Sequence, residues 1–243
     1  MTGLNAETVL TGFRQAKARR KSWETLWSEC YDFALPQHDG ALLNRPSGQG
    51  RGDRLFDATA ADAVDQLAAS LMAELTPPWS RWFELVAGVD IDDEERDAMG
   101  VALDRASAVL QTHFDRSNFG LEIHQAYLDL VTVGSASLLF EEAPSGESSA
   151  FRFTAVPIGQ VALEEGESGR LDTTYRSTEL SDAQLRARFP EARLPPHKAP
   201  GQKGKADDDA RHTIIEAVIP DENGMRQYAA VLTDGGEEGW VIS

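Results

Sequence analysis

The sequence contains one cysteine, Cys30, among its 243 residues. A single cysteine excludes an intramolecular disulfide, so the apolar core has to hold the fold by itself. No stretch approaches the roughly 18 consecutive apolar residues of a membrane-spanning helix, and the polar residues 1–5 have no signal-peptide character. We therefore expect a soluble protein made in a cytoplasm, without membrane contact, in which Cys30 packs as a small hydrophobic residue.

Patterns typical of catalysis or metal binding are equally scarce. The five histidines are His38, His113, His124, His197 and His212. None of them lies at the spacings that zinc sites use. The glycine-rich residues 47–53 follow no strand and lack a final Gly-Lys-Ser or Gly-Lys-Thr, which indicates a loop rather than a phosphate-binding site. Residues 134–137 do not match the nucleophile elbow Gly-x-Ser-x-Gly.

Carboxylates, by contrast, are abundant: 40 acidic residues face 23 basic ones, for a net charge of −17. A hydrolase that uses scattered acids is one alternative, because paired carboxylates can serve as general acid and base. The densest group, residues 92–95, starts a predicted helix, where acids complement the helix dipole. No histidine or spaced acid completes a metal site there. We predict that the chain is not an enzyme, with no catalytic residue, no metal and no cofactor.

The charge is unevenly distributed along the chain. Residues 1–56 hold eight basic and six acidic groups, or +2, which leaves −19 for the remainder. One predicted helix carries five basic residues with no acid among them: Arg14, Lys17, Arg19, Arg20 and Lys21. This helix can meet solvent, an acidic neighbouring subunit or phosphate. DNA carries about one negative charge per 1.7 Å of duplex, so a chain that is acidic overall favours letting DNA pass over gripping it.

The clearest helix signal lies in residues 57–76. Asp57 is placed to cap the first turn, and Pro77 and Pro78 end the helix. The apolar positions recur at helical spacing and predict one buried face: Val64, Leu67, Ala68, Leu71, Met72 and Leu75. The prolines force extended backbone, which we expect to deliver three aromatic side chains to a packing surface: Trp79, Trp82 and Phe83.

Two further helices follow. The first spans residues 93–116, with a predicted buried stripe at Met99, Leu103, Ala106, Leu110 and Phe114. The second is capped by Ser117 or Asn118 and ends at Gly134. Its predicted buried face consists of Ile123, Tyr127, Leu130 and Val131.

After residue 135 the apolar period changes from helical to alternating. The predicted strands are residues 137–142, 150–156, 160–165, 170–177, 213–219, 227–233 and 239–243. Residues 166–169 and 221–224 are hairpin-sized connections, so antiparallel pairing is expected. One helix, 181–189, interrupts the strands, and residues 40–53 and 194–211 are predicted loops. The expected fold class is α+β: a helical part, 1–135, followed by a mostly antiparallel β part, 136–243.

The ordered set of motifs resembles the portal, or head-to-tail connecting, proteins of short-tailed, podovirus-type bacteriophages. Residues 56–60 and 75–78, with Trp82 and Phe83, bracket one helix as in that family. The upstream residues that agree are Arg20, Trp23, Trp27, Tyr31 and Pro36. The downstream residues and segments that agree are Phe119, Tyr127, Asp129, Gly134, Ser135, 169–172, Tyr175, Arg176, 181–189 and 214–220.

The resemblance implies the wing part of a portal subunit, which forms a ring, a dodecamer in this family, at one capsid vertex. Its implied partners are copies of itself, the major capsid protein, tail adaptor proteins, the terminase and the double-stranded DNA that passes through. It implies a location in the virion after assembly in the host bacterial cytoplasm. The family's channel-lining stem and clip are absent from the sequence, so we expect an N-terminal portion. The competing interpretation is an acidic scaffolding or adaptor protein that forms no ring.

Overall fold

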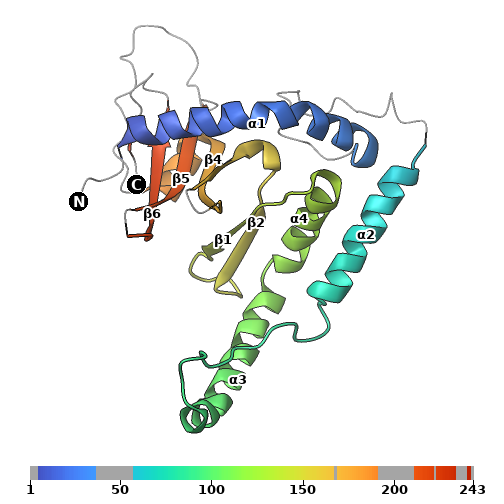
Figure 1. The fold of residues 1–243 in the computed structure, drawn as a ribbon, viewed down its shortest axis with the longest axis vertical. Helices are drawn as coiled ribbons and strands as arrows, with labels where there is room; N and C mark the ends of the chain where they lie inside the picture. The colour runs from blue at the N-terminus through green and yellow to red at the C-terminus, as the bar shows by residue number, and fades with distance from the viewer. Residues whose placement is uncertain are drawn as a thin grey trace, which may run out of the picture. The chain divides into compact units, whose positions relative to one another are not determined.

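The computed structural model describes residues 5–36, 57–166, 169–190, 211–221, 223–233 and 240–241. Helices come first and antiparallel strands follow, which confirms the α+β fold class (Figure 1). Contacts group the chain into two compact units, one from Met1–Thr25 and Gly159–Ser243, the other from Leu26–Ile158. These units differ from the expected division at residue 135, because the first helix packs on the later strands and the first hairpin packs on a helix.

The first unit contains a five-stranded sheet in which each strand pairs antiparallel with the next in sequence. The hairpin-sized connections 166–169 and 221–224 predicted two of these pairings, β3 with β4 and β5 with β6. Its strands are β3 (Val161–Glu165), β4 (Leu171–Ser181), β5 (Arg211–Pro220), β6 (Arg226–Leu232) and β7 (Trp240–Val241). The predicted loops 40–53 and 194–210 lie outside the described residues.

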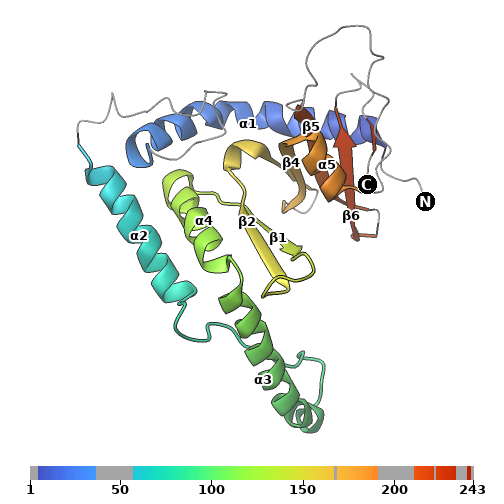
Figure 2. The ribbon, with the colours of Figure 1, turned by 180° about the vertical axis from the view of Figure 1, so that it is seen from behind.

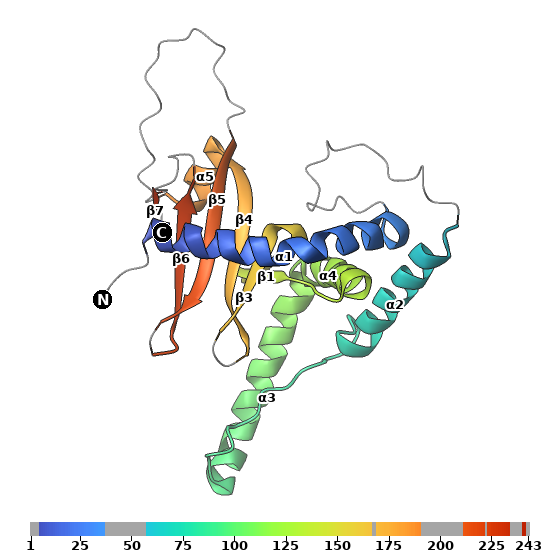
Figure 3. The same cartoon turned by 45° about the horizontal axis from the view of Figure 1, so that its top comes forward.

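Two helices cover opposite faces of this sheet (Figure 3). The first part of α1 (Ala6–Ala34) sets Val9 and Leu10 against a core that includes Ile215. On the other face, α5 (Asp182–Arg188) buries Leu185 against Ile214. Alternation of side chains along β5 places Ile214 and Ile215 on opposite faces, so one strand contributes to both cores.

The second unit is built around α4 (Phe119–Val133), which packs against α2 (Thr59–Leu75) and against a two-stranded hairpin (Figures 1 and 2). The hairpin consists of β1 (Leu138–Glu142) and β2 (Phe151–Ala155). The helix α3 (Asp93–Arg116) leads directly into α4. The α2–α4 core consists of Val64, Ala68, Tyr127 and Leu128.

Helix ends follow the sequence signals closely. Asp92 caps α3 by accepting a hydrogen bond from Glu95 N at 2.9 Å, and Gly134 ends α4 in the left-handed conformation with φ of 75°. Asp57 is one residue from its predicted role: Ala58 is the N-cap of α2, and Asp57 instead accepts from the backbone N and the hydroxyl of Thr59. These two hydrogen bonds lower the pKa of Asp57.

Several residues of the predicted buried stripes are exposed: Leu67 and Leu75 in α2, Met99 and Ala106 in α3, and Leu130 in α4. In α3 the fully buried residue is Ser107, which donates to Leu103 O and accepts from Leu85 N. The predicted stripe of α3 is therefore wrong at Met99 and Ala106. Periodicity locates apolar residues on a helix, but the neighbouring segments decide which side is covered.

Candidate functional site

Two of the five histidines have structural partners. His113 Nδ1 accepts from Ala150 N at 3.1 Å, and His212 lies 2.5 Å from Asp182. No group of three or more potential metal ligands occurs within the described ranges. No helix there has the length and apolar character to cross a membrane. His38 and His197 lie outside the described residues.

The buried acid Glu216 also has an internal role. Its carboxylate accepts from Arg188 at 2.9 Å, from Arg176 at 3.4 Å and from the Tyr228 hydroxyl at 2.8 Å. A buried carboxylate is costly unless it is paired in this way. The network ties α5 to β4, β5 and β6.

The corner after α2 is the most distinctive surface feature. Thr76 N donates to Met72 O and closes the helix, and the buried Thr76 hydroxyl lies 3.3 Å from Tyr127 Oη. The next two residues, Pro77 and Pro78, turn the chain outward. The corner is thereby fixed at one end to α4.

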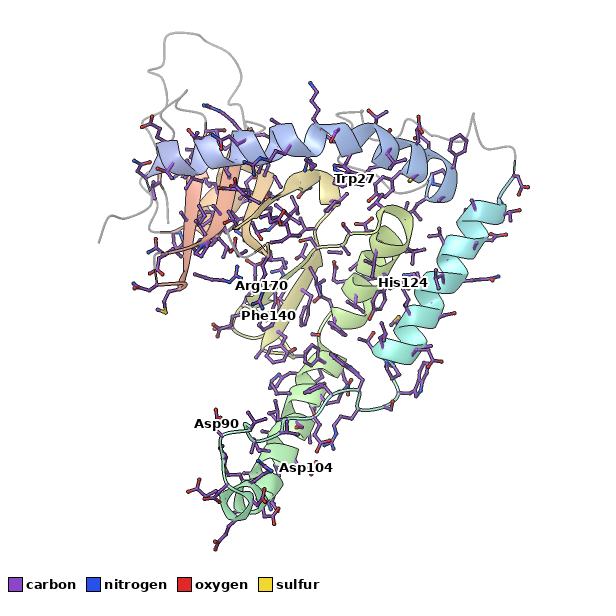
Figure 4. All side chains as sticks on the ribbon, in the orientation of Figure 1. Trp27, Asp90, Asp104, His124, Phe140 and Arg170 are labelled. Carbon is purple, nitrogen blue, oxygen red and sulfur yellow. The ribbon has the colours of Figure 1, made fainter. Side chains whose placement is uncertain are left out.

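Two of the three aromatic residues at this corner pack as predicted. Trp82 stacks on Phe119 with centroids 5.6 Å apart and planes 11° apart, and Phe83 lies 5.4 Å from Phe114. Arg81 holds the segment on α3 through an ion pair with Asp104 at 2.6 Å, and this partner raises the pKa of Arg81. Figure 4 shows Asp104 on α3.

Trp79 departs from the prediction, because its side chain is 74% exposed. Leu75, one turn earlier on α2, is 54% exposed, and Leu67 is also exposed. Leu67, Leu71 and Leu75 are spaced by four residues and share one side of α2. Leu71 packs against the α2–α4 core, whereas Leu67 and Leu75 remain exposed at its border. We call Leu67, Leu75 and Trp79 the corner surface.

The basic helix is divided between internal and external roles. Arg20, 11% exposed, binds Glu24 at 2.7 Å and donates to the carbonyls of Gly159 and Val161. Arg19 pairs with Glu164 at 3.0 Å. These contacts lie within the first unit. They remove Arg20 from the predicted external face, whereas the side chain of Arg19 remains 64% exposed.

Besides Arg19, the exposed residues of the basic group are Arg14, Lys17 and Lys21. Their spacing of three and four residues places them on one side of α1, and we call them the basic row. Lys17 Nζ also lies 5.8 Å from the ring centroid of Phe13. An exposed row of three cations suits an acidic partner surface.

Sequence reasoning missed the exposure of Trp79 and of the apolar segment after it, in which Val86 and Val89 are 75% and 92% exposed. The sequence held a signal, because large apolar residues lie close together in this segment. Such residues, when exposed, are typical of interaction surfaces. Asn118 is the N-cap position of α4, one of the two predicted, but its side chain makes no capping hydrogen bond and binds the backbone of Phe153 instead.

Comparison with known proteins gives one consistent result. The family model described as "Bacteriophage head to tail connecting protein" matches residues 6–242. A "Probable portal protein" of Bordetella phage BPP-1 is 28% identical over 182 residues, which cover 74% of this chain and 32% of that protein. A "Portal protein" of Salmonella phage epsilon15 is 25% identical over 190 residues, which cover 78% of this chain and 34% of that protein. The matched region thus spans about a third of each of these relatives.

Proposed function

Because this chain belongs to the bacteriophage head-to-tail connecting protein family, we propose that it is a portal subunit that assembles with copies of itself into a ring at one capsid vertex. The proposed ring is a dodecamer, as the family resemblance implies. Its work is mechanical: it surrounds the passage for DNA and provides attachment points on either side. In this proposal the chain has no catalytic role, and the terminase hydrolyses ATP.

The corner surface supports this proposal. A closed ring requires a heterologous interface, in which one face of a subunit meets a different face of the next. Tryptophan is enriched among the residues that anchor interfaces, and exposed apolar side chains that lie together are typical of interaction surfaces. Trp79 and Leu75 occupy such a position, because Thr76 between them is fixed to Tyr127. We infer that the corner surface contacts the neighbouring subunit.

The charge distribution supports the basic row as a second contact face of the subunit. The basic row lies on α1, and the chain after residue 56 carries −19. Opposite charges on two faces orient subunits and exclude wrong pairings. We infer that the basic row meets an acidic surface of another protein in the assembly, and that DNA passes without tight binding.

The finer assignments belong to the same proposal. We propose that the partners are the major capsid protein, tail adaptor proteins and, during packaging, the terminase, with double-stranded DNA moving through the ring. The proposed location is the capsid portal vertex, after assembly in the host bacterial cytoplasm. The two relatives described above are named as portal proteins, which supports these assignments.

Ring formation is tested on the protein isolated from phage-infected cells, by mass photometry and negative-stain imaging. We expect closed rings of uniform subunit number. A single monomeric species under conditions in which particles assemble would overturn the proposal in favour of an adaptor without ring formation. Labelling of the chain in purified virions tests the location: signal at one vertex is expected, and signal spread over the capsid would contradict it.

A further inference from the structure

The outer edge of β2 is closed by side chains of α4. Phe153 N donates to Asn118 Oδ1 at 2.9 Å, and Phe153 O accepts from Asn118 Nδ2 at 2.7 Å. Two residues on, Ala155 N donates to Glu122 Oε2 at 2.6 Å. These side chains occupy the backbone groups that another strand would need. No strand can pair with β2 along this edge without displacing them.

The opposite edge of the hairpin, on β1, is paired with no other strand among the described residues. The register pairs Phe140 with Phe153 and Leu138 with Ala155. Since Phe153 and Ala155 direct their N–H groups away from β1, antiparallel geometry makes Phe140 and Leu138 direct theirs away from β2. The sheet of β1 and β2 has two strands within the described residues. A row of backbone donors and acceptors therefore faces outward along β1.

Sheet edges in proteins are ordinarily protected. β1 is short and ends in two acidic residues, but it lacks the other usual devices. Proline, lysine, bulges and covering side chains block unwanted pairing at sheet edges. The sequence of β1, Leu-Leu-Phe-Glu-Glu, contains no proline or lysine, and its register with β2 is unbroken. The β3 edge offers a contrast, because Arg20 donates to the carbonyls of Gly159 and Val161 there.

The side chains along β1 define what could pair with it. The ring centroid of Phe140 lies 5.2 Å from that of Phe153 and 5.3 Å from that of Phe151, yet Phe140 is 58% exposed (Figure 4). Glu142 is exposed and lies two residues further, on the same face of the hairpin. An added strand would place one side chain beside Phe140 and, two positions away, another beside Glu142.

We propose that β1 is a strand-addition site for an extended segment of a partner protein that carries an apolar residue and, two positions away, a lysine or arginine. The apolar residue covers Phe140 and extends the aromatic cluster, while the cation pairs with Glu142. Backbone hydrogen bonds to Leu138 and Phe140 supply affinity that is independent of side chains. This inference does not require ring formation.

A different protein fits this edge better than a second copy. The edge strands that a second copy could offer are its own β1, which ends in Glu141 and Glu142, β3, which ends in Glu164 and Glu165, and the two-residue β7. None of these strands offers a basic residue to Glu142. Charge complementarity therefore favours a basic segment from another polypeptide.

The probe is a short fluorescent peptide in which threonine alternates with valine and lysine, so that valine and lysine share one face. We expect saturable binding to the purified chain by fluorescence anisotropy. Replacement of the peptide lysine by glutamate should weaken binding about tenfold, as a charge-assisted pair becomes a repulsion. Methylation of alternate peptide nitrogens on the pairing side should abolish binding. Equal binding of all three peptides, or of none, overturns the proposal.

Variants of the chain provide the matched test. Glu142→Gln should weaken binding of the lysine peptide several-fold, whereas Glu147→Gln, in the nearby turn, should leave it unchanged. Phe140→Pro removes an outward N–H without touching the β1–β2 ladder and should abolish binding, whereas Phe140→Ala should only weaken it. Hydrogen exchange at Val156 N, which donates to Ser137 O, reports whether the hairpin persists. If Phe140→Pro instead abolishes a self-association of the chain, the edge belongs to a second copy and the proposal fails.

Discussion

Gly12 on α1 lies directly against the hydroxyl of Tyr175 on β4, so that a Cβ at position 12 would overlap the phenol oxygen and lie 3.0 Å from Cζ. The helix approaches the sheet closely at this point because glycine has no side chain. Tyr175 is itself 3% exposed and belongs to the core under α1. The contact therefore fixes the distance between helix and sheet in the first unit.

Gly12→Ala should destabilise the protein by about 1–3 kcal/mol, because the core must shift to accept the methyl group. Gly100→Ala is the matched control: nothing lies within 4 Å of its Cβ position in α3. That change should stabilise by about 0.5–1 kcal/mol through helix propensity. Thermal unfolding measures both. Adding Tyr175→Phe to Gly12→Ala should recover part of the loss, and no recovery would place the strain elsewhere.

Tyr175 also makes stability depend on pH in the alkaline range. Burial, the charge of Glu164 and a hydrogen bond to Glu164 raise its pKa above the usual 10.0. The raised pKa means that the folded state holds the proton more tightly than the unfolded state does. Its contribution is fully present below pH 10 and is lost as the pH rises through the folded pKa. The melting temperature of the wild type should fall more steeply above pH 10 than that of Tyr175→Phe; parallel curves would contradict this.

Asn118 should be essential to the β1–β2 hairpin. Asn118→Ala removes both hydrogen bonds to Phe153 and should destabilise by about 1–3 kcal/mol, because a partly buried donor and acceptor lose their partners. Asn118→Asp retains the acceptor alone, so its stability should lie between that of the wild type and that of Asn118→Ala. Amide exchange at Phe153 N measures the effect. Unchanged protection in the alanine variant would show that the edge does not need this side chain.

Truncation of Trp82 should lower stability, whereas truncation of Trp79 should weaken assembly. Trp82→Ala removes a ring stacked on Phe119 and should cost about 3–5 kcal/mol of stability. Trp79→Ala should leave the melting temperature of the monomer unchanged, because the ring is exposed, and should weaken ring assembly about tenfold or more. Chemical denaturation and mass photometry separate the two effects. Normal assembly of Trp79→Ala would remove the corner surface from the interface.

Substitution of Arg20 and substitution of the basic row should likewise have different effects. Arg20→Ala should destabilise by about 1–3 kcal/mol, since the carbonyls of Gly159 and Val161 lose a buried donor. Arg14→Glu with Lys21→Glu should leave unfolding unchanged and weaken assembly more than retention of DNA in particles. Loss of DNA with intact assembly would reassign the basic row to nucleic acid.

Local signals in the sequence predicted most of the elements. The αL glycine Gly134, the acidic first turn of α3 and the hairpin-sized turns act over a few residues, so their effect is encoded where they stand. The strands of the sheet deviated from prediction mainly in length, as in β4, which continues to Ser181. Local rules fix where an element starts and stops more firmly than what it touches.

Burial and partnership were not readable from spacing. Arg19 and Arg20 belong to one basic run in the sequence, but α1 turns both toward acceptors in the first unit. Trp79 and Trp82 are equally aromatic, yet one stacks on Phe119 and the other faces outward. The difference arises from segments distant in sequence, which no local pattern contains.

The sequence by itself determined the α+β class, the order of helices and strands, and the family, because period, caps and turns are local properties and the motifs occur in a fixed order. Only the tertiary structure decided that Asn118 closes β2 while the outer edge of β1 pairs with no other strand in the described part of the chain, and that the corner surface is exposed. The physical reason is that an edge or a face is defined by what packs against it, and those partners come from elsewhere in the chain.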